Sequence, residues 1–457
     1  MPDHVVDQPG PTVPTVPTVP TWQVPGEAPD AASTVRGWVD GPVWRASGLR
    51  YAHAQRWQTP QLVPLASGDI DATRLAPSCP QVSFPLIDEV LDRVEPKLVT
   101  DEDCLRLSIT MPAGTAPDAG LPVMVWIHGG SYVTGAGDLP IYDPTALVTE
   151  HQVVVVTVTY RLGLFGYLRH AASPGNLGLL DQRTALEWVQ RYIAHFGGDP
   201  ANVTAFGESA GGDSVAHLMI ADGARGLFRR AIVMSAPLGL MPGRDKMYAA
   251  MADKVDGLSV DASVEEMLER TNSLQRMSIR YGLRAGMPFG PQYGVAPLPA
   301  EDDLDDAWSQ VAPDVDLLVG HTAREVALFV PPRLGRVPLR PAVRERLVRR
   351  LGNSIYDEPA RRFAQRHAAA GGSAATYLLH ADSHDDPRGE LLAGAHTTDL
   401  PYVFPGPAWE TIVAASGPAW HVTPEAGREV RAMLGGLARD GVAVERSGPP
   451  VLVRSLG

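Results

Sequence analysis

The chain has 457 residues, of which 44% are hydrophobic and 20% are charged, the balance of an ordinary globular protein. Its net charge of −13 disfavours nucleic acids and anionic membranes as partners, because these polyanions would repel it. No apolar run reaches the roughly 20 residues of a membrane-spanning helix, and the length suits one large domain or two average ones.

The N-terminal segment is distinct in composition. Residues 10–21 repeat Thr-Val-Pro, and the regular prolines remove backbone donors and favour an extended chain. We therefore expect residues 1–33 to be a disordered tail and residues 34–457 to be a single folded domain. The first ten residues lack the basic start and apolar stretch of a secretory signal. We expect a cytoplasmic protein, or a secreted one if a leader has been removed.

Strand-like and helix-like segments alternate through the rest of the chain. The runs PVMVWIH and VVVVTVTY are continuously apolar, which is typical of strands buried on both faces of a parallel sheet. The alternation predicts one doubly wound α/β domain. The predicted strands are 122–128, 153–160, 203–206, 231–235, 315–320 and 375–380; the predicted helical segments are 179–196, 241–310 and 335–370.

A nucleophile motif follows the third of these strands. Residues 203–217 read VTAFGESAGGDSVAH, a strand, a Gly-x-Ser-x-Gly turn and a helix. Gly207 and Gly211 allow the tight strand-to-helix corner, which holds Ser209 in an exposed and strained position. The motif is short enough to occur by chance, so Ser209 also needs a base and an acid elsewhere in the chain.

Glu325 is the candidate acid. In α/β-hydrolase architecture the acid follows the serine in the chain, and Glu325 comes directly after the strand VDLLVG. A solvated glutamate in the first turn of a helix is the alternative interpretation. The competing acids are Glu301 to Asp306, which lack a preceding strand, and Asp382, Asp385 and Asp386.

His396 is the candidate base. It lies in GAHTTDLPYVF, a late segment in which small residues precede an apolar stretch. His380 and His384 are rivals at a strand end and its turn, whereas His321 precedes Glu325, against the expected order.

A glycine-rich loop is the candidate oxyanion hole. Residues 126–137, WIHGGSYVTGAG, run from a strand end into an HGG-type loop, and acyl transfer needs backbone N–H donors of this kind. Ala210, directly after the serine, is expected to supply a further donor. A structural turn or a phosphate cradle are alternatives, and the absence of a Walker lysine disfavours the second.

Together these segments resemble the type-B carboxylesterase family, which includes cholinesterases and para-nitrobenzyl esterases. The resemblance runs from about residue 34 to about residue 441, and residues 176–212 are nearly the family consensus. The other matching segments are GLRYA with RWQTP, EDCLRLSI, PVMVWIHGGSY, FRRAIVMSAP, VGHTAREVALF, AHTTDLPYVF and LARDG.

The resemblance implies an α/β-hydrolase fold and a serine hydrolase that cleaves carboxylic esters of small molecules, with no cofactor or metal. It implies Ser209 as nucleophile, Glu325 as acid and His396 as base. The oxyanion hole it implies consists of Gly130, Ser131 and Ala210.

Further residues are expected to support this site. Ser235 matches a family serine near the histidine, and Glu208 and Gly129 adjoin the nucleophile and the oxyanion donors. The spacing of Cys79 and Cys104 is compatible with a disulfide or with two thiols, and a cytoplasmic protein favours thiols. The resemblance implies a disulfide between them under oxidising conditions.

The chain also departs from the family pattern, at Ser131, Asp213, Tyr293, Arg324 and Val326. The Ser131 side chain narrows the alcohol side of the expected site, whereas Asp213 is favourable near a helix N-terminus. The short C-terminal part predicts a reduced helical lid and an open gorge. We expect a preference for short or aromatic acyl groups. An acyltransferase or cyclase, or a non-catalytic binding protein on the same fold, are the alternative functions.

Overall fold

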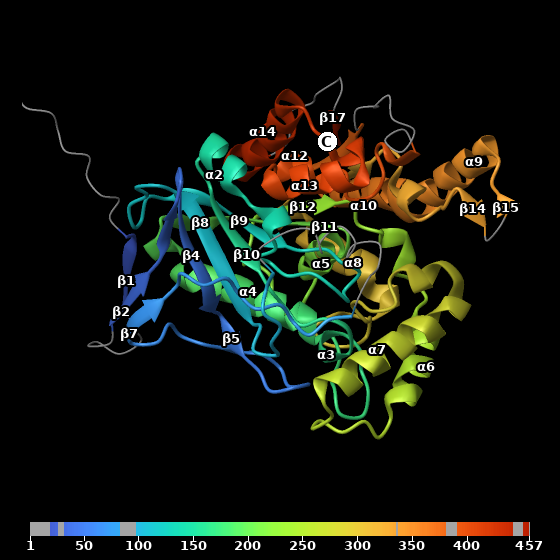
Figure 1. Cartoon of the computed structure of the whole chain (residues 1–457), viewed down its shortest axis with the longest axis horizontal. Helices are drawn as coiled ribbons and strands as arrows, with labels where there is room; N and C mark the ends of the chain where they lie inside the picture. Colours follow the sequence, from blue (N-terminus) through green and yellow to red (C-terminus); the bar gives the residue numbers. More distant parts are fainter. Residues whose placement is uncertain are drawn as a thin grey trace, which may run out of the picture.

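The computed structural model describes residues 19–25, 32–82, 97–334, 337–380, 391–441 and 451–456. A ten-stranded mixed sheet forms the centre of this part of the chain, with helices on both of its faces (Figure 1). Its strands, in spatial order, are β17 (Val451–Ser455), β16 (Ala374–Leu379), β13 (Asp316–Thr322), β12 (Arg230–Met234), β11 (Gly198–Glu208), β9 (Leu121–Ile127), β10 (Val154–Val158), β8 (Arg106–Pro112), β4 (Val43–Arg50) and β3 (Trp38–Asp40).

The strands from β16 to β10 in this order run parallel, and the pairs at both sides of them are antiparallel. All six predicted strands are confirmed as β9, β10, β11, β12, β13 and β16. The sequence underestimated β11, which begins at Gly198 and shifts register before Val203.

Strand β9 shows why a continuously apolar run of residues predicts a strand in this sheet. Val123, Val125 and Ile127 belong to the core on one face of the sheet. Met124 and Trp126 belong to the core on the other face. Because all five side chains are buried, the sequence of this strand is apolar at every position.

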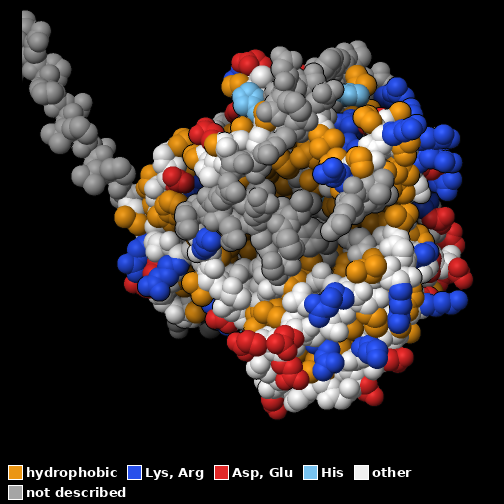
Figure 2. All heavy atoms as spheres, turned by 45° about the vertical axis from the view of Figure 1, so that its right-hand side comes forward, with side chains coloured by type: hydrophobic (Ala, Val, Ile, Leu, Met, Phe, Trp, Pro, Cys, Tyr) orange, Lys and Arg blue, Asp and Glu red, His pale blue; other side chains and the backbone are white. Residues whose placement is uncertain are grey.

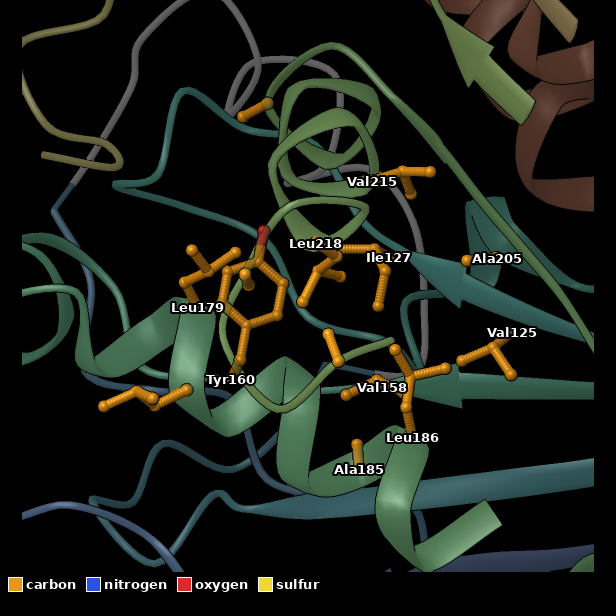
Figure 3. Packing of buried hydrophobic residues seen from close by; sticks show 14 of the residues in the cluster. Val125, Ile127, Val158, Tyr160, Leu179, Ala185, Leu186, Ala205, Val215 and Leu218 are labelled. Atoms are coloured by element: carbon orange, nitrogen blue, oxygen red, sulfur yellow. The ribbon is translucent and has the colours of Figure 1, made fainter. Parts of the chain in front are cut away.

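Two helices cover the first of these faces. The predicted helix 179–196 is α4 (Leu177–Tyr192), and its last residues form a 3-10 turn, Ile193–Phe196. In Figure 3 Ala185 and Leu186 of α4 lie below the strand residues Val125 and Val158, and Leu179 of the same helix belongs to this core as well. The second helix, α5 (Ala210–Leu218), follows β11 directly and contributes Val215 and Leu218 to the same core.

The two long helical segments that the sequence predicts each contain several separate helices. Residues 241–310 contain α6 (Asp245–Val255), α7 (Val264–Ser278) and α8 (Leu304–Val311). Residues 335–370 contain α9 (Pro341–Gly352) and α10 (Glu358–Ala369). The remaining helices and short strands are α2 (Thr145–His151), α3 (Gly163–Gly166), α12 (Leu400–Val403), α13 (Pro407–Ser416), α14 (Pro424–Asp440), β5 (Ala52–His53), β6 (Gln61–Leu62), β14 (Arg333–Leu334) and β15 (Val337–Pro338). Within the described ranges, every helix is too short or too polar to cross a lipid bilayer.

The folded region begins earlier than the sequence predicted. Strand β1 (Thr21–Pro25) pairs antiparallel with β2 (Ala32–Arg36), and β7 (Gly68–Asp71) completes this small sheet. Trp22 is 2% exposed and its ring contacts Trp44 and Phe196, with ring centroids 6.4 and 5.3 Å apart. The prediction of a disordered tail through residue 33 is therefore wrong for these strands, because Trp22 and Val24 are buried. Residues 1–18 and 26–31 lie outside the described residues.

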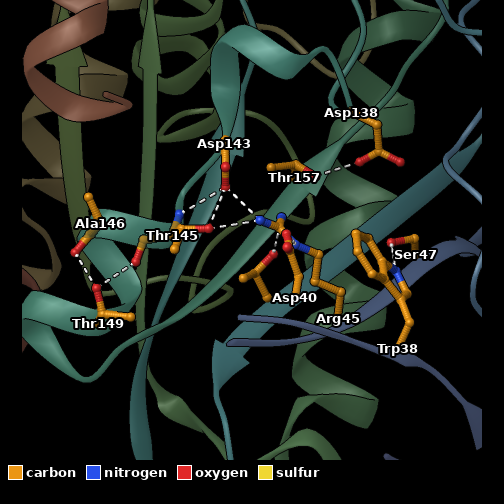
Figure 4. Close-up of polar contacts among 11 residues, drawn as sticks. Trp38, Asp40, Arg45, Ser47, Asp138, Asp143, Thr145, Ala146, Thr149 and Thr157 are labelled. Atoms are coloured by element: carbon orange, nitrogen blue, oxygen red, sulfur yellow. Dashed lines mark hydrogen bonds and ion pairs between the residues drawn. The ribbon is translucent and has the colours of Figure 1, made fainter. Parts of the chain in front are cut away.

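A polar cluster ties the edge of the large sheet to α2 (Figure 4). Arg45 of β4 donates hydrogen bonds to Asp40 at 2.8 Å, Asp143 at 2.6 Å and Thr145 at 2.8 Å. Nearby, Thr157 donates to Asp138 at 3.0 Å. These bonds fix the loop before α2 against the strands.

The two cysteines are buried neighbours. Cys79 and Cys104 are free thiols in this structure, and the disulfide that the family resemblance implies under oxidising conditions stays a prediction. A hydrogen bond with Cys79, together with burial, raises the pKa of Cys104 well above its ordinary value. A buried thiol that resists deprotonation is chemically unreactive.

Candidate active site

Ser209 lies at the corner between β11 and α5, as the sequence predicts, but it is buried, with 6% of its surface exposed, and the expected exposure is wrong. Its backbone has φ 57° and ψ −123°, which is strained for a residue with a side chain. A Cβ atom on Gly211 would overlap the Ile127 carbonyl oxygen of the neighbouring strand. The glycine is therefore required for the helix to start this close to the sheet, and the corner presents the serine side chain beyond the strand end.

The structure brings Ser209, His396 and Glu325 together. His396 Nε2 lies 2.8 Å from Ser209 Oγ, and His396 Nδ1 lies 2.5 Å from Glu325 Oε2. Glu325 is held by the Thr322 N–H, which donates to its Oε1 at 2.7 Å. The main-chain carbonyl of Glu325 accepts a hydrogen bond from the His396 N–H at 3.0 Å. Glu325 thus fixes the ring of His396 through its carboxylate and the backbone of His396 through its main-chain carbonyl.

The rival residues lie elsewhere. His321 pairs with Asp357 at 3.4 Å, and His380 is exposed at the end of β16. Glu301, in the acidic cluster before α8, accepts a hydrogen bond from the Gly243 N–H at 2.9 Å. His384, Asp382, Asp385 and Asp386 lie outside the described residues.

His396 is surrounded by negative charge. Burial by itself would lower the pKa of His396, but the carboxylates of Glu208 and Glu325 raise that pKa to about 9. Glu208 Oε1 lies 3.3 Å from His396 Nε2, on the nitrogen that faces the serine. Burial raises the pKa of the Glu208 carboxyl well above its usual range. In Glu325 burial acts in the same direction, but the charge of His396 prevails and lowers the pKa of that carboxyl.

Asp399 is a residue of this cluster that sequence reasoning missed. Ser235 donates to Asp399 Oδ2 at 2.8 Å, so the serine expected beside the histidine has the aspartate as its partner. Burial and the charge of Glu325 raise the pKa of Asp399 to about 6. The only sequence signal for Asp399 was its position three residues after His396, and no sequence pattern indicates that its carboxylate is buried.

The glycine-rich loop lies against the nucleophile corner. A Cβ atom on Gly129 would come within 2.8 Å of the Glu208 carbonyl oxygen and 3.2 Å of Ser209 Cβ. Gly130, Ser131 and Tyr132 all have positive φ, of 112°, 53° and 62°. This unusual run bends the loop over the start of α5, where the Ala210 N–H belongs to the first helical turn and has no intrahelical acceptor.

A buried hydrogen bond links this loop to α5. The Tyr132 hydroxyl donates to Asp213 Oδ2 at 2.6 Å and accepts from Ser214 Oγ at 3.1 Å. On the next turn of the helix, His217 Nε2 lies 2.9 Å from the Tyr293 hydroxyl. Asp213 is fully buried, and burial raises the pKa of its carboxyl. The expected benefit at a helix N-terminus is therefore outweighed by burial, and His217, whose Nδ1 lies 3.5 Å from Asp213 Oδ2, and the Tyr132 bond offset part of this cost.

The entrance side of the histidine is aromatic. The rings of Phe329 and Tyr356 have centroids 5.5 and 5.6 Å from that of His396. Phe329 remains 47% exposed, whereas Tyr356 is buried. Phe329 therefore marks the side of the triad that faces solvent.

The residues and their geometry are those of a serine hydrolase with an α/β-hydrolase fold. The model of the Carboxylesterase family matches residues 38–343, so the chain belongs to this family. It is a serine hydrolase that cleaves carboxylic esters, and small-molecule esters are its class of substrate. The esterase relatives favour hydrolysis over the acyltransferase and cyclase alternatives.

Two relatives illustrate the similarity in sequence. A probable N-octanoylanthranilate hydrolase of Rhodococcus erythropolis is 36% identical over 388 residues, which are 82% of this chain and 84% of the relative. The para-nitrobenzyl esterase of Bacillus subtilis is 35% identical over 65% of this chain and 62% of its own length. Among solved structures, a thermophilic PNB esterase matches with a TM-score of 0.77 and 26% identity, over 93% of this chain and 96% of its own.

Proposed function

We propose that Ser209, His396 and Glu325 are the catalytic residues of this esterase. The observation that carries the proposal is the pair of contacts at 2.8 and 2.5 Å between three side chains that come from distant segments. His396 Nε2 takes the proton of Ser209 as Ser209 Oγ attacks the ester carbonyl carbon. Glu325 holds Nδ1 protonated and compensates the positive charge that the ring acquires.

The developing oxyanion is bound by backbone N–H groups. We assign this role to Gly130, Ser131 and Ala210, which the loop and the first turn of α5 supply on one side of Ser209. His396 then gives its proton to the leaving alcohol, and the acyl group stays on Ser209 Oγ. Water, deprotonated by His396, attacks the acyl-enzyme and releases the acid.

Replacing the nucleophile tests this assignment. Ser209→Ala removes the only atom that forms the acyl bond, so hydrolysis of para-nitrophenyl acetate should fall by roughly 10⁴- to 10⁶-fold. Ser273→Ala, on the exposed face of α7, is the matched control and should keep wild-type activity. A fluorophosphonate probe should label the wild type and the control but not Ser209→Ala. Turnover or labelling that survives in Ser209→Ala, with an unchanged melting temperature, would refute the role of Ser209.

The acyl preference is a separate proposal. We expect short or aromatic acyl groups to be preferred. The Ser131 side chain, on the alcohol side of the site, bears on the size of the leaving alcohol instead. The R. erythropolis relative, whose name specifies an octanoyl amide of an aromatic amine, supplies the second candidate substrate class. A series of para-nitrophenyl esters from acetate to decanoate, measured beside N-octanoylanthranilate, discriminates between the two. A maximum of kcat/KM at octanoate would contradict the preference for short chains.

A further inference from the structure

An open cavity of about 680 Å³ lies behind the triad, between α9 and the ends of β13 and β16. Its lining includes Arg324, Arg346, Arg349 and Arg350, together with His321. The volume is in the range of sites for small molecules. The lining includes Glu325 but neither Ser209 nor His396, so the cavity adjoins the triad at its acid.

Three of the arginines have no carboxylate partner among the described residues. Arg346, Arg349 and Arg350 are exposed on α9, and no ion pair joins them to a described acidic side chain. The acidic residues that line the cavity are already engaged, because Asp357 pairs with His321 and Glu325 with His396. Arg324 is bound to Glu345 at 2.8 Å and is not counted as free.

These three positive charges lie close together on α9, and two of them, Arg349 and Arg350, are in its last turn. Arg346 lies three and four positions before Arg349 and Arg350, so its positive charge is a neighbour of both and repels them. On α10, by contrast, Arg361 and Arg362 both bind Glu358. Lys and Arg side chains also gather along the upper right edge in Figure 2, on the side where Figure 1 places α9. In a chain of net charge −13, these guanidinium groups form a local excess of positive charge that attracts anions.

We propose that this cavity binds a small phosphorylated compound through Arg346, Arg349 and Arg350. Guanidinium groups present paired N–H donors that match phosphate oxygens, and several of them together favour an anion of more than one charge. The concave shape of the cavity favours a small molecule as the ligand over a partner with a flat binding surface. The proposal does not depend on the catalytic roles assigned above, because it concerns binding alone.

Calorimetric titration with pyrophosphate, at constant ionic strength, tests the site directly. The wild type should give a saturable isotherm with one site per chain. Arg349→Gln/Arg350→Gln should weaken binding by at least about tenfold, since each lost charge-assisted hydrogen bond removes this much affinity. Arg276→Gln/Arg340→Gln removes the same charge at exposed positions outside the cavity and should bind like the wild type.

A vesicle assay identifies the source of the phosphate group. Flotation with phosphatidic acid vesicles but not with phosphatidylcholine vesicles, lost in Arg349→Gln/Arg350→Gln, would support a lipid headgroup as the ligand. Pyrophosphate binding without flotation would support a soluble phosphate compound. The proposal is overturned if neither probe binds, or if both double variants lose binding equally. Hydrolysis of para-nitrophenyl acetate serves as a check that the variants are folded.

Discussion

His396 is the residue on which the electrostatics of the site converge. It touches Glu325 through Nδ1 and approaches Glu208 through Nε2, at 2.5 and 3.3 Å. A general base acts only in its neutral form, so activity is lost as the pH falls below the pKa of that base. With the pKa of His396 raised to about 9, hydrolysis should increase with pH through the alkaline range.

Removing the charge of Glu208 should change this pH dependence. Glu208→Gln keeps the shape of the side chain but removes the largest of the charges that raise the pKa of His396. The midpoint of the acidic limb of kcat/KM should therefore move to lower pH. The profile is measured with para-nitrophenyl acetate, after subtraction of spontaneous hydrolysis. Glu269→Gln, on the exposed side of α7, is the control, and an unchanged midpoint in Glu208→Gln would contradict the electrostatic argument.

At the scale of the element, the contact between the oxyanion loop and α5 determines the geometry of the site. Tyr132 directly follows Ser131, and Asp213 lies one turn after Ser209. Their hydrogen bond at 2.6 Å therefore connects the donors of the loop to the helix that carries the nucleophile. A loop with three successive positive φ values needs such an external restraint, because its backbone conformation is unfavourable by itself.

Tyr132→Phe tests the restraint. Loss of the hydroxyl frees the loop from Asp213, and small displacements of the donors should lower kcat by roughly 10- to 100-fold with little change in KM. Tyr293→Phe is the matched control, because it removes a partly buried hydroxyl that contacts α5 at His217 but does not contact the oxyanion loop. Both variants are expected to lower the melting temperature. Equal kcat values in the two variants would show that the Tyr132 bond is merely structural.

The sequence revealed elements and motifs better than contacts. Strands β9 and β10 were predictable because burial on both faces makes all of their residues apolar except Thr157. Ser209 was predictable because the turn requires glycine on both flanks. The bond between Tyr132 and Asp213 joins residues 81 positions apart, and no local pattern indicates it. Asp399 was missed for the same reason: its burial results from packing around Glu325 and Ser235, not from the residues beside it.

At the scale of the whole molecule, the main error of the sequence analysis was the start of the folded region. The prolines of residues 10–21 suggested that the extended conformation continues to residue 33. In β1, however, exposed and buried residues alternate, and the buried positions are Trp22 and Val24. Burial of the Trp22 side chain, which is 2% exposed, stabilises the packing of β1 against the fold although a proline repeat precedes this strand.

Trp22→Ala should therefore destabilise the entire fold although the residue lies outside the predicted domain. Truncation of a buried tryptophan costs about 3 kcal/mol or more, because the cavity beside Trp44 and Phe196 loses its contacts. The measurement is urea unfolding followed by intrinsic fluorescence, with Gln23→Ala as the control. Gln23 is exposed in the same strand, and its replacement should change stability by no more than about 0.5 kcal/mol. Because β1 is remote from the triad, kcat should stay unchanged in the folded Trp22→Ala protein. Equal stability of the two variants would mean that β1 does not belong to the cooperative fold and that the domain begins near residue 34 after all.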